Sequence, residues 1–192
     1  MRVFGIDPGS ERTGFGCVES DGRRHRLVRC GAIRATGAVF SDRLGMIYRG
    51  LSAEIDECHP DCVAVENLFY ATNVRSALKL GHARGVAMLA AVEHGLPVLE
   101  YTPAEIKSAV VGYGRAEKHQ VQQMVKLLLA LERVPSPHDA ADALAVAICL
   151  IHQGITASRT RAVREATGQD RTPAPRSWRQ YRPARSLDGP KS

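Results

Sequence analysis

Three short apolar segments follow one another at the start of the chain, and no helical pattern lies between them. They cover residues 3–7, 13–19 and 27–35, and the turn-forming sequence Asp7-Pro8-Gly9 ends the first of them. Short apolar runs bounded by turn residues are typical of strands. Successive strands joined by short turns pair antiparallel, because a parallel pair needs a long crossover connection. The first 35 residues are therefore predicted to form an antiparallel meander.

Helical and strand patterns alternate in the rest of the chain. The spacing of apolar residues and the positions of cap residues, Gly and Pro predict these elements. Ser41, Asn73 and Thr102 stand at the expected N-caps of three helices. The expected bounds are 41–59, 73–93, 102–111, 116–131 and 137–152 for helices, and 61–66 and 96–101 for strands. The order βββαβαβα, with further helices at the end, predicts an α/β fold with helices on both faces of a five-stranded mixed sheet.

Composition excludes several classes of protein. With 44% hydrophobic and 24% charged residues, the 192-residue chain can bury one core of ordinary size, unlike disordered, collagenous or disulfide-stapled chains. Its longest apolar run, residues 143–151, is shorter than the roughly 20 residues that span a bilayer, so we expect no membrane partner. Five scattered cysteines, an odd number, argue against a disulfide framework and favour a cytoplasmic location.

Charge is distributed unevenly along the chain. Residues 1–152 contain 17 Lys and Arg against 17 Asp and Glu, whereas residues 153–192 contain 9 against 3. The formal net charge of +6 therefore belongs to the C-terminal part alone. That part contains many Arg and Pro residues and shows little apolar periodicity. We expect one folded domain over residues 1–153 and a basic, disordered tail over residues 154–192.

Four acidic residues stand at positions where a fold of this kind gathers side chains. Two of the apolar strand patterns end in a carboxylate, Asp7 and Glu66. The ligand crevice of open α/β sheets lies beyond the carboxyl ends of the strands, so neighbouring strands would present these two acids side by side. Asp139 and Asp142 are three residues apart and share one face of the last helix, where small alanines allow close approach to the sheet. Each acid alone could equally be a solvated turn residue or a partner of the helix dipole.

Four converging carboxylates have a chemical consequence. They repel one another and raise each other's pKa unless cations neutralise them. Oxygen ligands suit Mg²⁺ or Mn²⁺, which complete their shells with water and substrate phosphate. Two such ions can stabilise the attacking and leaving oxygens of a phosphodiester. The acids therefore predict metal-assisted phosphodiester hydrolysis.

Five sequence blocks occur in order along residues 1–152. They read GIDPGSERTGFG, ENLFYATN, ALKLGHARGVA, VVGYGRAEKHQV and DAADALAVAIC. Together they closely resemble the RuvC family of crossover junction endodeoxyribonucleases. The resemblance implies a ribonuclease H-like fold and a structure-selective endonuclease of DNA recombination and repair. Such an enzyme resolves four-way (Holliday) junctions by paired symmetric nicks that leave 5′-phosphate and 3′-hydroxyl ends.

The resemblance also implies roles for individual acids. Asp7, Glu66, Asp139 and Asp142 match the catalytic acids that bind two Mg²⁺ ions per subunit, for which Mn²⁺ can substitute. Asp7 would bridge both ions. His138 directly precedes Asp139 and is the alternative ligand, because a histidine replaces the first acid of this pair in some members of the family.

Further residues would contact DNA. By the resemblance, Lys107 and Lys118 contact phosphates around the cut strand, although both could be ordinary surface lysines of a helix. Phe69, with Tyr70 as the adjacent alternative, matches the aromatic residue that stacks on a base at the opened crossover. Its place on a loop offers little packing reason for an aromatic side chain.

The segment 73–84 begins the long helix and carries a basic stripe. Asn73, Arg75 and Lys79 are its expected DNA contacts, and Arg84 continues the stripe. The helix matches the one through which members of the family form homodimers, and a two-fold axis would place two sites on two strands of the junction. RuvA and RuvB, the branch-migration proteins, are the other partners that the resemblance implies. The arginines between residues 23 and 34 are expected to form a solvated face of the outer strands.

Two other function classes stay open at this point. The turn after Asp7, followed by Thr13 and Gly14, can cradle phosphate as in actin-like ATPases, but such proteins need a second similar lobe that this chain lacks. A non-catalytic junction-binding protein is the other alternative. It would tolerate loss of Asp7 or Glu66, so separate measurements of cutting and binding discriminate between the two readings.

Overall fold

A computed structural model describes residues 1–67 and 73–167 of the chain, with side chains described up to residue 154. Residues 1–157 form one compact unit and residues 158–192 a second. The fold described below is that of the first unit. The predicted boundary between residues 153 and 154 stays a prediction, and the expected base-stacking residues Phe69 and Tyr70 lie outside the described residues.

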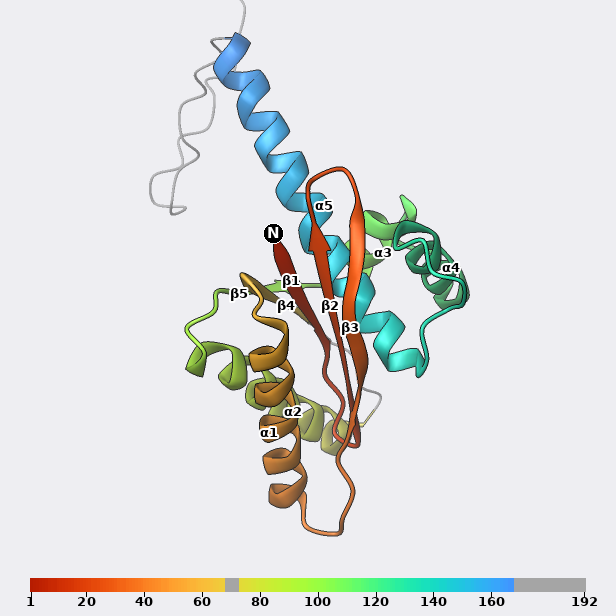
Figure 1. The fold of residues 1–192 in the computed structure, drawn as a ribbon. Coiled ribbons are helices and arrows are strands. Elements are labelled where there is room, and N and C mark those ends of the chain that lie inside the picture. The colour runs from red at the N-terminus through yellow and green to blue at the C-terminus, as the bar shows by residue number, and fades with distance from the viewer. Residues whose placement is uncertain (68–72, 168–192) are drawn as a thin grey trace, which may run out of the picture. The chain divides into compact units, whose positions relative to one another are not determined.

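Five strands form one mixed sheet in the order β3-β2-β1-β4-β5 (Figure 1). Strand β1 pairs antiparallel with β2, and β2 pairs antiparallel with β3, which confirms the predicted meander. Strands β4 and β5 join the other edge of β1 in parallel. The strands are β1 (Arg2–Asp7), β2 (Arg12–Ser20), β3 (His25–Arg34), β4 (Cys62–Glu66) and β5 (Val98–Tyr101).

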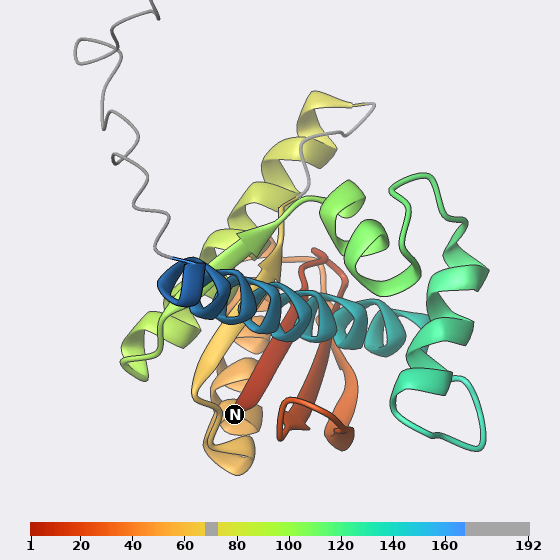
Figure 2. The ribbon, with the colours of Figure 1, turned by 90° about the horizontal axis from the view of Figure 1, so that it is seen from above.

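Helices cover both faces of this sheet, as predicted. They are α1 (Phe40–Cys58), α2 (Val74–Glu93), α3 (Pro103–Val111), α4 (Lys118–Leu128) and α5 (His138–Thr167). Alternate residues of β1 point to opposite faces. Phe4 and Ile6 pack with α1 and α2 in one core, whereas Val3 packs with α3, α4 and α5 in the other. Figure 2 shows α5 crossing the strands on its face of the sheet.

Two of the three predicted helix caps are confirmed. The Asn73 side chain accepts a hydrogen bond from the Arg75 backbone N–H at 2.8 Å, and Thr102 forms a capping box with Glu105. The prediction for Ser41 is wrong, because α1 begins at Phe40 and has no side-chain cap. The Phe40 ring lies edge-on to the His82 ring of α2, with 5.8 Å between ring centroids. This contact favours an earlier start of the helix than the sequence pattern suggested.

The last two helices differ in length from the sequence expectation. Helix α4 ends at Leu128 instead of residue 131, because Ala130 adopts a left-handed backbone conformation with φ of 50°. Helix α5 continues to Thr167, well beyond residue 152. Residues 155–167 contain Ala, Arg and Glu, which favour helices, and no Gly or Pro. Little apolar periodicity therefore did not prevent helix formation there.

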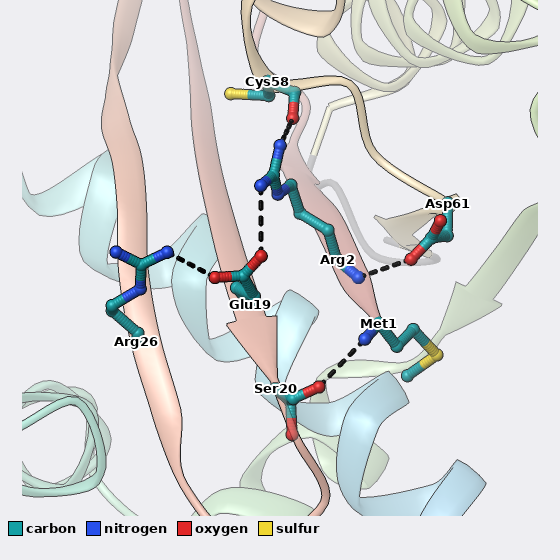
Figure 3. A network of polar contacts seen from close by, with 7 residues as sticks. All are labelled: Met1, Arg2, Glu19, Ser20, Arg26, Cys58 and Asp61. Carbon is teal, nitrogen blue, oxygen red and sulfur yellow. Dashed lines mark hydrogen bonds and ion pairs between the residues drawn. The ribbon is translucent and has the colours of Figure 1, made fainter.

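Ion pairs and hydrogen bonds gather around Arg2, at the beginning of β1 (Figure 3). The Arg2 guanidinium group donates to the Cys58 carbonyl at 2.6 Å and forms an ion pair with Glu19 at 3.0 Å. Its backbone N–H donates to the Asp61 carboxylate at 2.6 Å. Arg26 of β3 forms a second ion pair with Glu19. We call this group, Arg2, Glu19, Arg26 and Asp61, the paired end of the sheet.

Two further expectations concern cysteines and membranes. All five cysteines carry free thiols, and four of them are buried in the two cores. No helix in the described part of the chain is both long enough and apolar enough to cross a membrane.

Candidate active site

Asp7 and Glu66 end two neighbouring strands, at the end of the sheet opposite to the paired end. Strands β1 and β4 run parallel, and Ile6 lies beside Val65 in their register, so the next residue of each strand is the acid. Both acids are partly buried. Their carboxyl groups are close enough for each to shift the pKa of the other. The predicted juxtaposition of these two carboxyl groups is confirmed.

The turn after Asp7 is fixed by a buried hydroxyl group. The Thr13 side chain is fully buried, and its hydroxyl donates to the Gly9 carbonyl at 2.8 Å. A Cβ atom on Gly9 would lie 2.1 Å from the Arg12 carbonyl oxygen, so the turn has no room for a larger residue. The sequence pattern suggests only a phosphate-binding role for Thr13. In the structure it holds the turn that carries Asp7.

Close packing of α5 on the sheet brings the other two acids to the same end. A Cβ atom on Gly14 would lie 2.0 Å from the Asp139 carbonyl oxygen, and one on Gly5 would lie 2.0 Å from the Ala143 carbonyl oxygen. The strands and the helix therefore touch backbone to backbone at these points. The alanines of the helix predict this close approach only in part. The strands must also have glycines, Gly5 on β1 and Gly14 on β2, where the helix backbone touches them.

Asp142 shares one cavity with the acid pair. The cavity has a volume of about 350 Å³ and is lined by Asp7, Glu66, Asp142, Lys107 and Lys118, together with apolar side chains of α3, α4 and α5. The Lys118 ammonium group lies 2.6 Å from the Asp142 carboxylate. Three predicted acids and both predicted phosphate-binding lysines thus meet in one place, which we call the acid cavity.

Asp139 faces a different hollow. Its carboxylate forms an ion pair with Arg12 at 3.3 Å, and it does not line the acid cavity. Its charge still acts on Asp7 by raising the pKa of that group. His138, the alternative ligand, is exposed at the first position of α5 and lines neither hollow.

Two carboxyl groups of the acid cavity, Asp7 and Glu66, have raised pKa values. Burial is the largest cause of a pKa of about 8 for Asp7, and the charge of Glu66 is the next. The pKa of Glu66 is raised as well, mainly by burial. Asp142 adds a like charge that raises the pKa of both groups. Acids with pKa values raised by burial and by neighbouring like charges are typical of functional sites.

The two lysines partly compensate this negative charge. Both Lys118 and Lys107 oppose the rise in the pKa of Glu66. The hydrogen bond with Asp142 is the main reason that the pKa of Lys118 is raised, so this lysine is held charged. The cavity therefore combines acids that resist ionisation with ammonium groups that attract anions.

The donor groups of the acid cavity fit a hard divalent cation in their chemistry. All are carboxylates, and a cation would relieve the repulsion that raises the pKa values of Asp7 and Glu66. Among the described residues, however, no three His, Cys, Asp or Glu side chains are gathered tightly enough to hold an ion. Asp142 and Asp139 are turned toward Lys118 and Arg12 instead.

The expected DNA contacts on α2 are at its exposed beginning. Asn73, Arg75 and Lys79 are all exposed there, and Asn73 also caps the helix. The Lys79 ammonium group lies 6.0 Å from the centre of the Phe40 ring of α1. Arg84, further along, forms an ion pair with Glu100 and has less freedom to bind DNA. The basic stripe is therefore available mainly over residues 73–79.

Sequence reasoning missed Arg12 and assigned Arg34 to a solvated face. Arg12 is the partner of Asp139, and Arg34 lines the same hollow. Only the pairing of Arg12 with Arg34 in the register of β2 and β3 brings them together. Arg26 and Arg29, by contrast, form ion pairs with Glu19 and Glu54.

The fold and the site together define a class of protein. A five-stranded mixed sheet with acids at the ends of its central strands, crossed by a helix with further acids, is the architecture of ribonuclease H-like proteins. A family model described as crossover junction endodeoxyribonuclease RuvC matches residues 3–150. The chain therefore belongs to the RuvC family. This membership decides against the actin-like ATPase alternative.

Individual relatives agree with this assignment. A crossover junction endodeoxyribonuclease RuvC from Koribacter versatilis is 55% identical over 164 residues, which are 84% of this chain and 99% of that protein. The structure of T. thermophilus RuvC in complex with Holliday junction substrate matches with a TM-score of 0.78 and 34% identity, over 82% of this chain and 97% of that chain. The yeast mitochondrial Holliday junction resolvase Ydc2 shares the fold, with a TM-score of 0.67 at 15% identity over 86% of this chain and 83% of that chain.

Proposed function

We propose that this chain resolves four-way DNA junctions by hydrolysing one phosphodiester in each of two opposed strands. The products would be nicks with 5′-phosphate and 3′-hydroxyl ends. The observation that carries the proposal is the Asp7–Glu66 pair, whose pKa values are raised in a cavity that also contains two lysines. Membership of the RuvC family supports the choice of substrate, because relatives of this chain are crossover junction endodeoxyribonucleases.

The lysines of the acid cavity would position the scissile phosphate. Lys107 and Lys118 place two ammonium groups on the wall of a cavity that otherwise contains carboxylates. Asp142 holds the Lys118 side chain on that wall. A phosphate oxygen that enters would gain charge-assisted hydrogen bonds from both lysines, and the negative charge that develops during hydrolysis would strengthen them.

The acids of the cavity would hold the metal. Asp7, Glu66 and Asp142 would bind two Mg²⁺ ions, or Mn²⁺ as a substitute, with Asp139 as a further ligand and His138 as its alternative. Bound divalent cations supply Lewis acidity and positive charge to the scissile phosphate. Asp142 and Asp139 would exchange their present partners for this role. The carboxylate-only donor set supports a hard cation of this kind.

Proton release from Asp7 would accompany metal binding. With a pKa of about 8, the Asp7 carboxyl group is largely protonated at neutral pH. A cation binds the ionised form, so metal binding displaces that one proton. We expect cation affinity to rise as the pH increases toward 8. The proton on Asp7 thereby lowers the negative charge of the pair until metal is present.

A homodimer is the finer structural part of the proposal. Helix α2 exposes large apolar side chains that no described residue covers, among them Val74 and Leu78 near its beginning and Leu89 and Val92 near its end. Such a face supports pairing with a second copy. Two-fold symmetry would then give two acid cavities for two opposed strands, with Arg75 and Lys79 beside the DNA. Cooperation with RuvA and RuvB and a cytoplasmic location are further expectations, supported by family membership.

Incision of a synthetic four-way junction tests the proposed function. A linear duplex with the same arm sequences serves as the matched control, and both are incubated with Mg²⁺ and with a chelator. We expect symmetric nicks in two opposed strands of the junction only, and only with the metal. Equal cutting of the duplex would contradict structure selectivity, and cutting in the chelator would contradict the metal requirement. Binding without any cutting would favour the non-catalytic alternative.

A measurement independent of activity tests the metal site. Mg²⁺ should raise the thermal unfolding midpoint of the wild-type protein at pH 8 and have less effect at pH 5, where Asp7 retains its proton. The Asp7→Asn variant should lose most of the Mg²⁺ effect at pH 8. An equal shift in both proteins would place the metal elsewhere.

A further inference from the structure

A second hollow adjoins the acid cavity at the beginning of α5. It has a volume of about 660 Å³, and three arginines from different parts of the chain line it, namely Arg12, Arg34 and Arg43. Glu11 and Asp139 add two carboxylates to its wall. Three positive and two negative groups leave a formal charge of +1. We call it the arginine hollow.

The backbone of three elements fixes the arginines in place. Arg12 begins β2 and lies beside Arg34, which ends β3. The Ala35 backbone N–H donates to the Glu11 carbonyl at 2.9 Å, which extends this pairing beyond the strands. Arg43 comes from the first turns of α1, and its guanidinium group lies 5.2 Å from the centre of the Phe40 ring. The hollow is therefore built from rigid elements.

The hydrogen-bonding capacity of these arginines is largely unused. Only 12% of the Arg43 side chain is exposed, and its buried Nε has no hydrogen-bond partner in the described part of the chain. Its one ion pair, with Glu11, is long at 3.5 Å. Arg34 forms no ion pair with any described residue. An arginine carries five N–H donors, and a buried donor without a partner is costly, so the hollow is suited to an anion with several acceptor oxygens.

The arginine hollow lies between the acid cavity and the basic beginning of α2. Asp139 lines it, and Asp142, one turn later on α5, lines the acid cavity. On the other side, the Phe40 ring that contacts Arg43 also contacts Lys79 of α2. The hollow thus connects the acid cavity with the exposed basic beginning of α2. A strand that reaches both would carry one of its phosphates past Arg34 and Arg43.

We infer that the arginine hollow binds a non-scissile backbone phosphate of the DNA substrate. The ligand class is a phosphodiester, which accepts paired hydrogen bonds from guanidinium groups. This inference rests on the proposed function, because it assumes that DNA enters the neighbouring acid cavity. Arg34 and Arg43 are the positioning residues. Arg12, the present partner of Asp139, lines the same hollow.

Salt-dependent binding of a four-way junction tests the inference. Affinity is measured in a chelator, where no cutting is expected, for the wild type, Arg34→Gln, Arg43→Gln and the double variant. Each single variant should bind about fivefold to tenfold more weakly at low salt. The slope of log K against log salt should become less steep by about 0.9, because one phosphate contact is lost. Arg24→Gln, on the exposed hairpin at the far end of β2 and β3, is the matched control and should match the wild type.

The outcomes separate this inference from the proposed function. A wild-type protein that neither binds nor cuts junctions overturns both. A wild-type protein that binds and cuts, with a double variant of equal affinity and equal salt slope, overturns only the arginine hollow. Inorganic phosphate is the second probe, and its binding is measured as a rise in the thermal unfolding midpoint. If it stabilises the wild type but the variants bind DNA normally, the hollow takes a free anion, and the DNA inference is wrong. Arg34 is exposed and unpaired, so its replacement tests the site even if Arg43→Gln fails to fold.

Discussion

The two ends of strand β1 carry the same kinds of residues in opposite electrostatic arrangements. At the paired end, Arg2 and Arg26 flank Glu19, and their hydrogen bonds lower the pKa of that carboxyl group. At the site end, burial and a neighbouring carboxyl group raise the pKa of Asp7 to about 8. The six-residue strand β1 thus runs from Arg2, which favours the charge of its neighbour Glu19 on β2, to Asp7, whose own charge is opposed.

This difference shows where the fold is stabilised and where it is prepared for a ligand. Arg2 joins β1 to the Cys58 carbonyl and to Glu19, so the paired end connects several elements. The acids of the site end contribute repulsion instead. A bound cation would relieve this repulsion between Asp7 and Glu66, whereas Asp142 and Asp139 would first have to leave their present partners.

The largest effect is expected from Asp7→Asn at the site end. The substitution keeps the size of the side chain and removes its charge, so cutting of a four-way junction should fall by about a thousandfold or more. Junction affinity in a chelator should stay within about twofold, since phosphate contacts come from basic residues. Cutting and binding are measured separately. Retained cutting would defeat the assignment of Asp7, and lost binding would indicate a damaged fold.

A glycine at each end provides the second test. Gly14→Ala should destabilise the protein by about 3 kcal/mol and reduce cutting, because the new Cβ would collide with the Asp139 backbone and displace α5. Gly22, in the hairpin near the paired end, has a φ of 91° and open space around it. Gly22→Ala should cost only about 1–2 kcal/mol of backbone strain and leave cutting unchanged. Chemical denaturation and junction nicking decide, and equal loss of cutting in both variants would refute the close-contact explanation.

The third test is the pH dependence of stability at the site end. An acid whose pKa is raised on folding favours the folded state least at high pH, because the unfolded chain releases the proton from about pH 4 upward and the folded chain only near pH 8. Without metal, Asp7→Asn should therefore stabilise the protein by an amount that is negligible at pH 4 and grows as the pH rises toward 8. Denaturant unfolding across this range measures the difference. A gain that is constant with pH would not come from Asp7 ionisation.

The smallest effect, with the opposite sign, is expected at the paired end. The pKa of Glu19 is lowered on folding, so its stabilising contribution is present above its ordinary pKa and is lost as the pH falls through the lower, folded value. Glu19→Gln should slightly destabilise the protein at pH 7, and the difference from the wild type should disappear on acidification. High salt should reduce it as well, since exposed ion pairs are screened. A destabilisation that persists in acid would point to lost packing instead.

The positions of Asp7 and Glu66 show how much of the site could be predicted from the sequence. Apolar runs that end in an acid predicted both the strands and the meeting of their carboxyl groups. Side chains at the carboxyl ends of neighbouring parallel strands lie at the same edge of the sheet. The cap residues Asn73 and Thr102 were equally predictable, since capping depends on local hydrogen bonds. The prediction that Ser41 caps α1 is wrong. The helix begins at Phe40, whose ring contacts His82, a residue far away in sequence.

The strand and helix order, the mixed sheet, the acids of the site and the family follow from local patterns or from blocks of residues in order. The pairing of Asp142 with Lys118 and of Asp139 with Arg12, and the hollow lined by Arg34 and Arg43, become visible only in the folded molecule. These contacts join residues from different elements, and their energies depend on burial and distance, which a linear pattern of residues does not contain.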